Sequence, residues 1–141
     1  MAQRVALITG GGKRIGAATA SLLMEHGWFV LIHVRNSVVE AQQILEGFEQ
    51  KNGSKAPAEI LQADLNVDED ITSLLQAVSG HEMVKKSGGL HALIHNASIY
   101  SSQDYDSVSL ETLRLNTRLH IEVPFVLTPV SYTHLTLPTT D

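Results

Sequence analysis

Four short apolar segments rich in Val, Ile and Leu alternate along the chain with longer segments that carry a helical period. The short segments lie at residues 5–9, 28–33, 59–62 and 90–95. Runs of this length and composition are typical of strands buried on both faces. In the longer segments apolar residues recur every three to four positions, as at Ile71, Leu74, Leu75 and Val78. The order predicts an α/β fold in which helices cover both faces of a parallel sheet.

The remaining connections carry weaker signals. Residues 51–57 read as a loop before the third strand, and residues 80–89, with mixed polar content, as a looser connection. A last helix is expected to begin near Leu110, capped by Ser107 or Ser109, with Pro124 kinking it or beginning its end. The resulting βαβαβαβα order predicts the N-terminal part of a doubly wound, Rossmann-like parallel sheet. We expect the sheet to be incomplete in this chain.

Composition narrows the class of protein. The 141 residues are 43% hydrophobic and 18% charged, which is typical of one globular domain with a real core. A net charge of -5 argues against a nucleic-acid partner, and the absence of Cys excludes disulfides and thiolate metal sites. His91 and His95 lie on an expected strand, where their spacing makes no helical ligand pair, so no metal site is expected. The apolar run at the start is too short for a signal peptide or membrane span, which indicates no membrane partner and a cytoplasmic location.

A glycine-rich segment lies between the first strand and the first helix. Residues 9–16 read Thr-Gly-Gly-Gly-Lys-Arg-Ile-Gly, at the place where a parallel sheet sets a dinucleotide pyrophosphate against a helix N-terminus. The glycines permit the tight turn and close backbone approach, and the last one lets helix and strand pack closely. We expect Gly10, Lys13, Arg14 and Ile15 to contact the cofactor. A tight turn without a ligand would use the same glycines.

The second strand ends in His33-Val34-Arg35-Asn36-Ser37. About 20 residues past such glycines, an acidic residue would accept hydrogen bonds from the ribose hydroxyls of NAD, but this segment holds no Asp or Glu. Arg35 and its neighbours His33, Asn36 and Ser37 suit a 2′-phosphate instead, which predicts NADP as the cofactor. Arg35 as an ordinary solvated residue at the start of a helix is the alternative.

Polar residues also follow the third and fourth strands. Asp64 and Leu65 come after the third strand, and His95-Asn96-Ala97-Ser98 comes at the end of the fourth. From the residues alone, Asp64 could equally be a turn or cap residue.

Together these motifs resemble the short-chain dehydrogenase/reductase family over residues 5–128. The Thr-Gly-x-x-x-Arg-x-Gly pattern has Arg14 in place of the family's middle Gly or Ala, which is similar to the pteridine reductase branch. Asp64-Leu65 resembles the family's pair along the adenine, and residues 95–98 resemble its Asn-Asn-Ala-Gly segment. The resemblance implies that Asp64, Leu65, Asn96 and Ala97 contact the cofactor.

The same branch holds a pterin with a serine and an aromatic residue two positions later. The resemblance therefore implies that Ser98 hydrogen-bonds a pterin, that Tyr100 stacks on it, and that Arg14 faces it from beside the pyrophosphate. Without the resemblance, Tyr100 would be an ordinary half-buried aromatic residue.

The last helix offers two candidates for the family's helix Asn, which supports the proton relay. Asn116 is one, but counting back from Pro124-Phe125 places His120 at that position. Residues 119–125 resemble the dihydromonapterin reductase subgroup, which favours His120 as the catalytic residue. A half-buried helix histidine without chemistry is the alternative.

The end of the chain departs from the family pattern, in which a strand bearing Ser and a Tyr-x-x-x-Lys helix should follow. Tyr132 has Thr136, not Lys, four residues on. Residues 130–139 match, codon by codon, a translated transposase adapter used in sequencing libraries; a genuine Thr-rich tail is the alternative. We therefore expect residues 1–128 to be an NADP-binding half-domain without its main catalytic residues, residues 129–141 to be a non-native tail, and the fragment to be inactive.

For the intact parent enzyme, the resemblance implies NADPH-dependent reduction of a dihydropterin or dihydrofolate-like substrate in a homo-oligomer, a tetramer as in the family. One alternative is a short-chain reductase of carbonyl substrates such as 3-oxoacyl thioesters, which Gly or Ala at position 14 would have favoured. A non-catalytic dinucleotide-binding module is the other.

Overall fold

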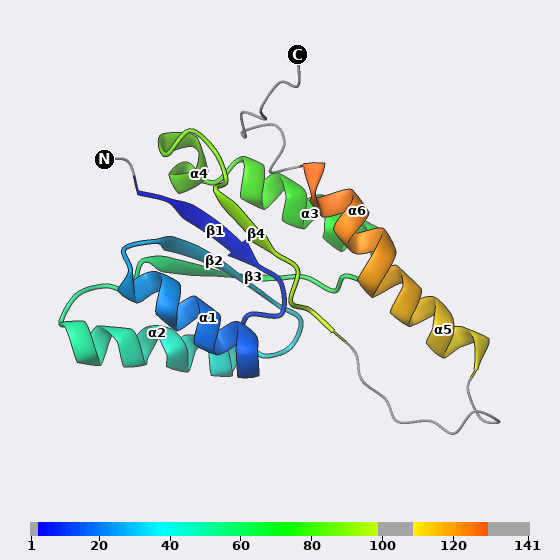
Figure 1. Cartoon of the computed structure of the whole chain (residues 1–141), viewed down its shortest axis with the longest axis horizontal. Helices are drawn as coiled ribbons and strands as arrows, with labels where there is room; N and C mark the ends of the chain where they lie inside the picture. The colour runs from blue at the N-terminus through cyan, green and yellow to red at the C-terminus, as the bar shows by residue number, and fades with distance from the viewer. Residues whose placement is uncertain (1–2, 99–108, 130–141) are drawn as a thin grey trace, which may run out of the picture.

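The computed structural model describes residues 3–98 and 109–129 (Figure 1). In chain order its elements are β1 (Val5–Ile8), α1 (Arg14–Glu25), β2 (Phe29–Val34), α2 (Val38–Asn52), β3 (Ala58–Gln62), α3 (Asp68–Ser79), α4 (Glu82–Lys86), β4 (Ala92–Ile94), α5 (Leu110–Thr117), the π-helical turn η2 (Arg118–Glu122) and α6 (Val123–Leu127). The predicted alternation of strands and helices is confirmed.

The four strands form one parallel sheet in the order β3-β2-β1-β4. β1 lies in the middle, with Ile8 in register with Ile32 of β2 on one side and Ile94 of β4 on the other. The chain winds outward from β1 through β2 to β3 and then crosses back to the opposite side of β1. The strand order therefore reverses between β1 and β4, and in doubly wound sheets ligands bind at the carboxyl ends of the strands beside such a point. The predicted fold class is confirmed.

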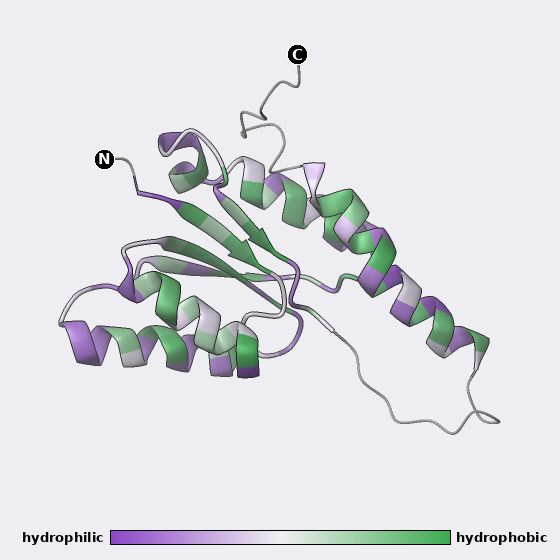
Figure 2. Ribbon diagram, viewed as in Figure 1, coloured by the Kyte–Doolittle hydropathy of each residue, from purple (hydrophilic) through white to green (hydrophobic). Residues whose placement is uncertain are grey.

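Two hydrophobic cores lie on opposite faces of the sheet because successive strand residues point to opposite sides. Val5, Leu7 and Leu31 face α3, α4 and α6, whereas Ile8 and Ile32 face α1 and α2. All five side chains are fully buried. Figure 2 shows β1 and β4 as largely apolar, the edge strand β3 as partly polar and the outer helices as mixed, which fits a sheet whose centre is covered on both faces.

The last helical region begins and bends for identifiable reasons. Ser109 caps α5 by accepting a hydrogen bond from the Thr112 N–H at 3.1 Å, as predicted, whereas Ser107 lies outside the described residues. The irregularity expected at Pro124 takes the form of η2, where the Val123 N–H bonds to the Arg118 carbonyl five residues back. Proline has no N–H to continue the α-helical pattern, so the distortion lies just before it. No helix in residues 3–98 or 109–129 is long and apolar enough to cross a membrane.

The segment expected to be a loose connection, residues 80–89, contains the short helix α4. Its first turn is capped by His81, whose Nδ1 accepts from the Met83 N–H at 3.1 Å, and Val84 is buried in the core. A five-residue helix is too short to show a period, and histidine is not among the usual capping residues. Sequence patterning therefore gave no signal for it.

Candidate functional site

A cleft of about 420 Å³ lies at the carboxyl ends of the strands, where the strand order reverses. It is lined by Gly10, Gly12, Lys13, Arg14, Ile15, His33, Val34, Arg35, Ser37, Asp64, Leu65, Asn66, Asn96, Ala97, Ser98 and Leu119. The fold thus brings together most of the residues singled out in the sequence. It adds Gly12, which belongs to the glycine-rich segment, together with Val34, Asn66 and Leu119, which were not among the predicted site residues.

The glycine loop is held so tightly that side chains would not fit. Gly10 has φ +65°, and a Cβ there would lie 2.8 Å from the Cα of Ala97. A Cβ on Gly16 would lie 2.5 Å from the Gly10 carbonyl oxygen and 2.6 Å from Nδ2 of Asn96. The predicted close packing at Gly16 is confirmed. It brings the N-terminus of α1 up to the cleft.

Thr9 and Asn96 join this loop to the segment after β4. The Thr9 hydroxyl oxygen accepts the N–H groups of Asn96 and Ala97, each at 3.1 Å, and is buried. The Asn96 side-chain amide donates to the Gly10 carbonyl at 2.9 Å. The glycine loop and the segment after β4 are therefore fixed relative to each other. Sequence reasoning missed this role of Thr9; its only signal was a hydroxyl residue directly after a buried strand.

His33 is a buried support of the cleft. Its Nδ1 accepts the Gly10 N–H at 3.0 Å and its Nε2–H donates to the Ala63 carbonyl at 2.9 Å. Burial lowers the pKa of His33, an effect opposed by the Ala63 hydrogen bond and the charge of Asp64. The ring is thus neutral, with its proton on Nε2. Because both ring nitrogens are engaged by the protein, we expect His33 to position the loops around a cofactor rather than to hydrogen-bond it.

Three cationic side chains surround the cleft, and they differ in their partners. Arg35 Nε lies 3.7 Å from Oδ2 of Asp64, and Lys13 Nζ lies 3.8 Å from Oε1 of Glu40. Arg14 forms no side-chain hydrogen bond or ion pair with the residues of the described ranges, and its backbone is left-handed, with φ +51°. Its guanidinium is therefore the cation most available to a ligand.

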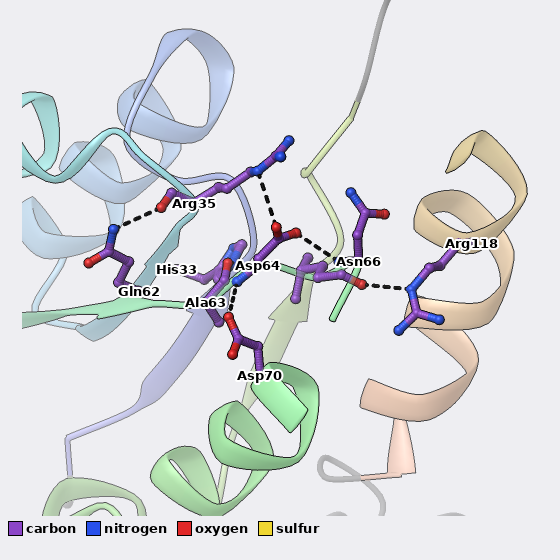
Figure 3. A network of polar contacts seen from close by, with 9 residues as sticks. His33, Arg35, Gln62, Ala63, Asp64, Asn66, Asp70 and Arg118 are labelled. Atoms are coloured by element: carbon purple, nitrogen blue, oxygen red, sulfur yellow. Dashed lines mark hydrogen bonds and ion pairs between the residues drawn. The ribbon is translucent and has the colours of Figure 1, made fainter. Parts of the chain in front are cut away.

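The segment after β2 lacks a carboxylate of its own, but the fold supplies one from the end of β3. Figure 3 shows Asp64 beside Arg35, and both residues line the cleft. Asn36 lies apart from the main cleft, in an adjacent hollow lined by Arg35, Asn36, Gln62, Ala63, Asp64 and Asp70. Exposed ion pairs of this kind contribute at most about 1 kcal/mol, so a doubly charged anion can replace Asp64 as the partner of Arg35.

The loop after β3 is fixed by a network that includes a residue absent from the sequence prediction. The Asp64 N–H donates to Oδ2 of Asp70 at 2.7 Å, and the Asn66 N–H donates to Oδ1 of Asp64 at 2.9 Å. Arg118, from η2, donates through Nε to the Leu65 carbonyl at 3.1 Å (Figure 3).

The predicted catalytic residue lies beside the cleft rather than in it. His120 lines a neighbouring cavity of about 90 Å³ together with Thr9, Ala97 and Leu119, and its Nε2 lies 3.4 Å from the Ser98 hydroxyl. The Asn116 amide donates to the Thr112 carbonyl one turn back on its own helix. Tyr100, predicted to stack on the substrate, lies outside the described residues. Within the described residues, no three His, Asp or Glu side chains come close enough to hold a metal ion.

The chain belongs to the short-chain dehydrogenase family, whose model matches residues 4–134. The predicted family is confirmed. A dihydromonapterin reductase from Enterobacter sp. (strain 638) is 34% identical over 125 residues, covering 89% of this chain and 46% of that protein. A hydroxynaphthalene reductase from Aspergillus fumigatus is 35% identical over 124 residues, covering 85% of this chain and 42% of that protein. The chain thus spans less than half the length of these two relatives.

Solved structures with the same fold include NADP complexes. FolM alternative dihydrofolate reductase 1 from Brucella canis, complexed with NADP, superposes with a TM-score of 0.75 at 25% identity, covering 96% of this chain and 50% of that one. A short-chain dehydrogenase from Burkholderia cenocepacia, also in complex with NADP, gives 0.77 at 27% identity, covering 96% and 51%. The dihydromonapterin reductase and FolM relatives support the pteridine reductase-like branch.

Proposed function

We propose that this chain is the cofactor-binding half of an NADPH-dependent reductase that acts on a dihydropterin or dihydrofolate-like ring. The observation that carries the proposal is Arg14, whose guanidinium has no hydrogen-bond or ion-pair partner in residues 3–98 or 109–129. Its backbone is left-handed, and it lies at the N-terminus of α1 and lines the cleft. A non-glycine residue in that conformation costs about 1–2 kcal/mol. Strain of this kind persists where the side chain has a function, and here the function is to meet an anion.

The residues present fit a dinucleotide phosphate. Gly10 lines the cleft, where its backbone can approach a pyrophosphate, and the N-terminus of α1 and Arg14 supply positive charge to it. The 2′-phosphate would meet Arg35 and Ser37 in the main cleft, together with Lys13, and Asn36 from the hollow beside it.

The two ends of the cofactor would meet different walls of the cleft. Asp64 and Leu65 form the side expected to carry the adenine, whereas Ile15, Asn96 and Ala97 line the side left for the nicotinamide. When bound, NADPH supplies the hydride. His33 and Thr9 hold these walls in place from behind.

The substrate side rests on Ser98, Arg14 and His120. Ser98 lines the cleft, and its hydroxyl can accept from or donate to a flat heterocycle while His120 lies behind it. His120 would then orient the Ser98 hydroxyl or hold a proton near it. We expect Tyr100 to stack on the ring, a geometry favoured by aromatic ligands.

A second candidate substrate class follows from the comparisons. The hydroxynaphthalene reductase relative is as similar to this chain as the dihydromonapterin reductase is, at 35% against 34% identity. An aromatic substrate other than a pterin, reduced at a carbonyl, is therefore the alternative. Arg14, by contrast, favours the pterin.

Assembly into a homo-oligomer is part of the proposal. Ile121 and Phe125 leave 64% and 81% of their surface exposed on one side of η2 and α6. Two large apolar side chains exposed one helical turn apart can contribute to an interface, and a second copy of the chain is the partner we propose.

The proposed cofactor is tested by titrating the purified chain with NADPH and NADH and following nicotinamide fluorescence. We expect NADPH to bind at least tenfold more tightly, because the 2′-phosphate adds charge-assisted hydrogen bonds of roughly 1.5–3 kcal/mol. Arg35→Gln should remove the preference, and Arg35→Asp should reverse it. Equal affinities for both cofactors, unchanged in the variants, would contradict the assignment.

A further inference from the structure

Arg118 connects the last helical region to the loop after β3. It is the first residue of η2, and its guanidinium donates through Nε to the Leu65 carbonyl at 3.1 Å and pairs through Nη2 with Asp68. Only 23% of the Arg118 side chain is exposed, against 84% for Asp68. The hydrogen bond to Leu65 is thus made by a largely buried side chain, whereas the ion pair with Asp68 involves an exposed carboxylate.

The Leu65 carbonyl belongs to a loop whose neighbouring backbone N–H groups already have partners. The N–H groups of Asp64 and Asn66 are held by carboxylates, as Figure 3 shows. Leu65 itself is only 4% exposed, yet it lines the cleft. Arg118 supplies the side-chain donor for its carbonyl, so the peptide unit between Leu65 and Asn66 is held at its N–H by Asp64 and at its carbonyl by Arg118.

We propose that Arg118 is a positioning residue for the adenine end of the cofactor. It does not line the cleft; it acts by holding the Leu65 carbonyl and so fixes the wall that Asp64 and Leu65 present. The inference rests on the proposed function, because it assigns the adenine to this wall. Since Leu119 in the same turn lines the cleft, Arg118 also ties the helix that carries His120 to the cofactor side of the site.

The chemistry of the contact requires arginine. A guanidinium offers an Nε–H toward Leu65 and a second nitrogen toward Asp68 in one rigid plane. Lysine at this position would keep the charge but lack the fixed Nε–H. Arg118→Lys therefore separates loss of the bond to Leu65 from loss of charge, while Asp68→Asn removes the carboxylate charge from the exposed pair and leaves the bond to Leu65.

The test measures binding of two half-cofactors to the purified chain by calorimetry. Adenosine 2′,5′-bisphosphate probes the adenine end, and reduced nicotinamide mononucleotide probes the other. In Arg118→Lys we expect adenosine 2′,5′-bisphosphate to bind roughly three- to tenfold more weakly, the range of a lost buried hydrogen bond, with the mononucleotide affinity unchanged. Asp68→Asn should bind both probes as the parent does.

Circular dichroism verifies the fold of each variant; if Arg118→Lys does not fold, Arg118→Met takes its place with the same expected split. Parent-like binding of adenosine 2′,5′-bisphosphate in the folded variant would overturn the inference. An equal loss for both probes would also overturn it, because it would show a general loosening of the fold. If the parent chain binds neither half-cofactor nor NADPH, the proposed function itself fails.

Discussion

Replacing Arg14 with glycine should relieve backbone strain in the folded chain but weaken the binding of NADPH. Its φ of +51° lies in the left-handed region, which costs a residue with a side chain about 1–2 kcal/mol. Glycine avoids that cost but loses about 0.5–1 kcal/mol more than alanine in backbone entropy. Arg14→Gly should therefore be more stable than Arg14→Ala by about 0.5–1 kcal/mol. Neither substitution breaks a side-chain hydrogen bond or ion pair within the described residues, so the comparison of the two variants reports mainly on the backbone.

Urea unfolding of the two variants measures this difference, and NADPH titration measures the effect on binding. Both variants should lose at least about tenfold in affinity, because a hydrogen bond to a charged group contributes roughly 1.5–3 kcal/mol. Lys13→Gly is the matched control. Lys13 has φ -140°, an ordinary extended value, so glycine there should destabilise the fold. It is a control for the unfolding measurement alone, because Lys13 is among the residues proposed to meet the 2′-phosphate.

Two outcomes would refute this reasoning separately. If Arg14→Gly unfolds at lower urea concentration than Arg14→Ala, the left-handed backbone is not strained in the way described. If both variants bind NADPH as tightly as the parent does, Arg14 makes no contact with a phosphate, whatever the stability result.

Three further predictions concern other parts of the molecule. Burial lowers the pKa of His33 in the folded chain below the ordinary 6.5 of the unfolded chain. As the pH falls below about 6.5, the unfolded chain therefore binds this proton more readily than the folded chain, and the free energy of unfolding should fall. His33→Asn should flatten that decline in acid urea titrations, the remaining slope including His95, whose pKa burial also lowers. Phe125→Glu should shift the chain toward monomer in analytical ultracentrifugation; an unchanged mass would contradict the proposed interface. Sequencing the source locus past the codon for Thr128 should show DNA that does not encode residues 130–139 as written, and finding those codons there would remove the proposal of a non-native tail.

The elements that sequence analysis found are those whose signal is local. The buried strands, the cap at Ser109 and the tight glycine loop each depend on residues a few positions apart. Arg118 escaped detection because its partner, Leu65, is 53 positions away and the contact depends on the π-helical turn. His33 was recognised as a site residue, but its orientation is set by backbone groups of Gly10 and Ala63, which follow two other strands. Its polarity alone therefore suggested contact with the cofactor.

The pairing of β1 with β4 has a consequence for how the protein folds. β1 and β2 are near in sequence, but the Asn96 amide reaches the Gly10 carbonyl across 86 positions. Closing so long a loop is slow relative to local helix formation, so this side of the cleft is expected to form late. A ligand that needs both segments recognises only chains in which the β1–β4 ladder is complete, and its binding free energy adds to the stability of that state alone. Cofactor affinity and completion of the sheet are thus coupled through the one strand, β1, that both require.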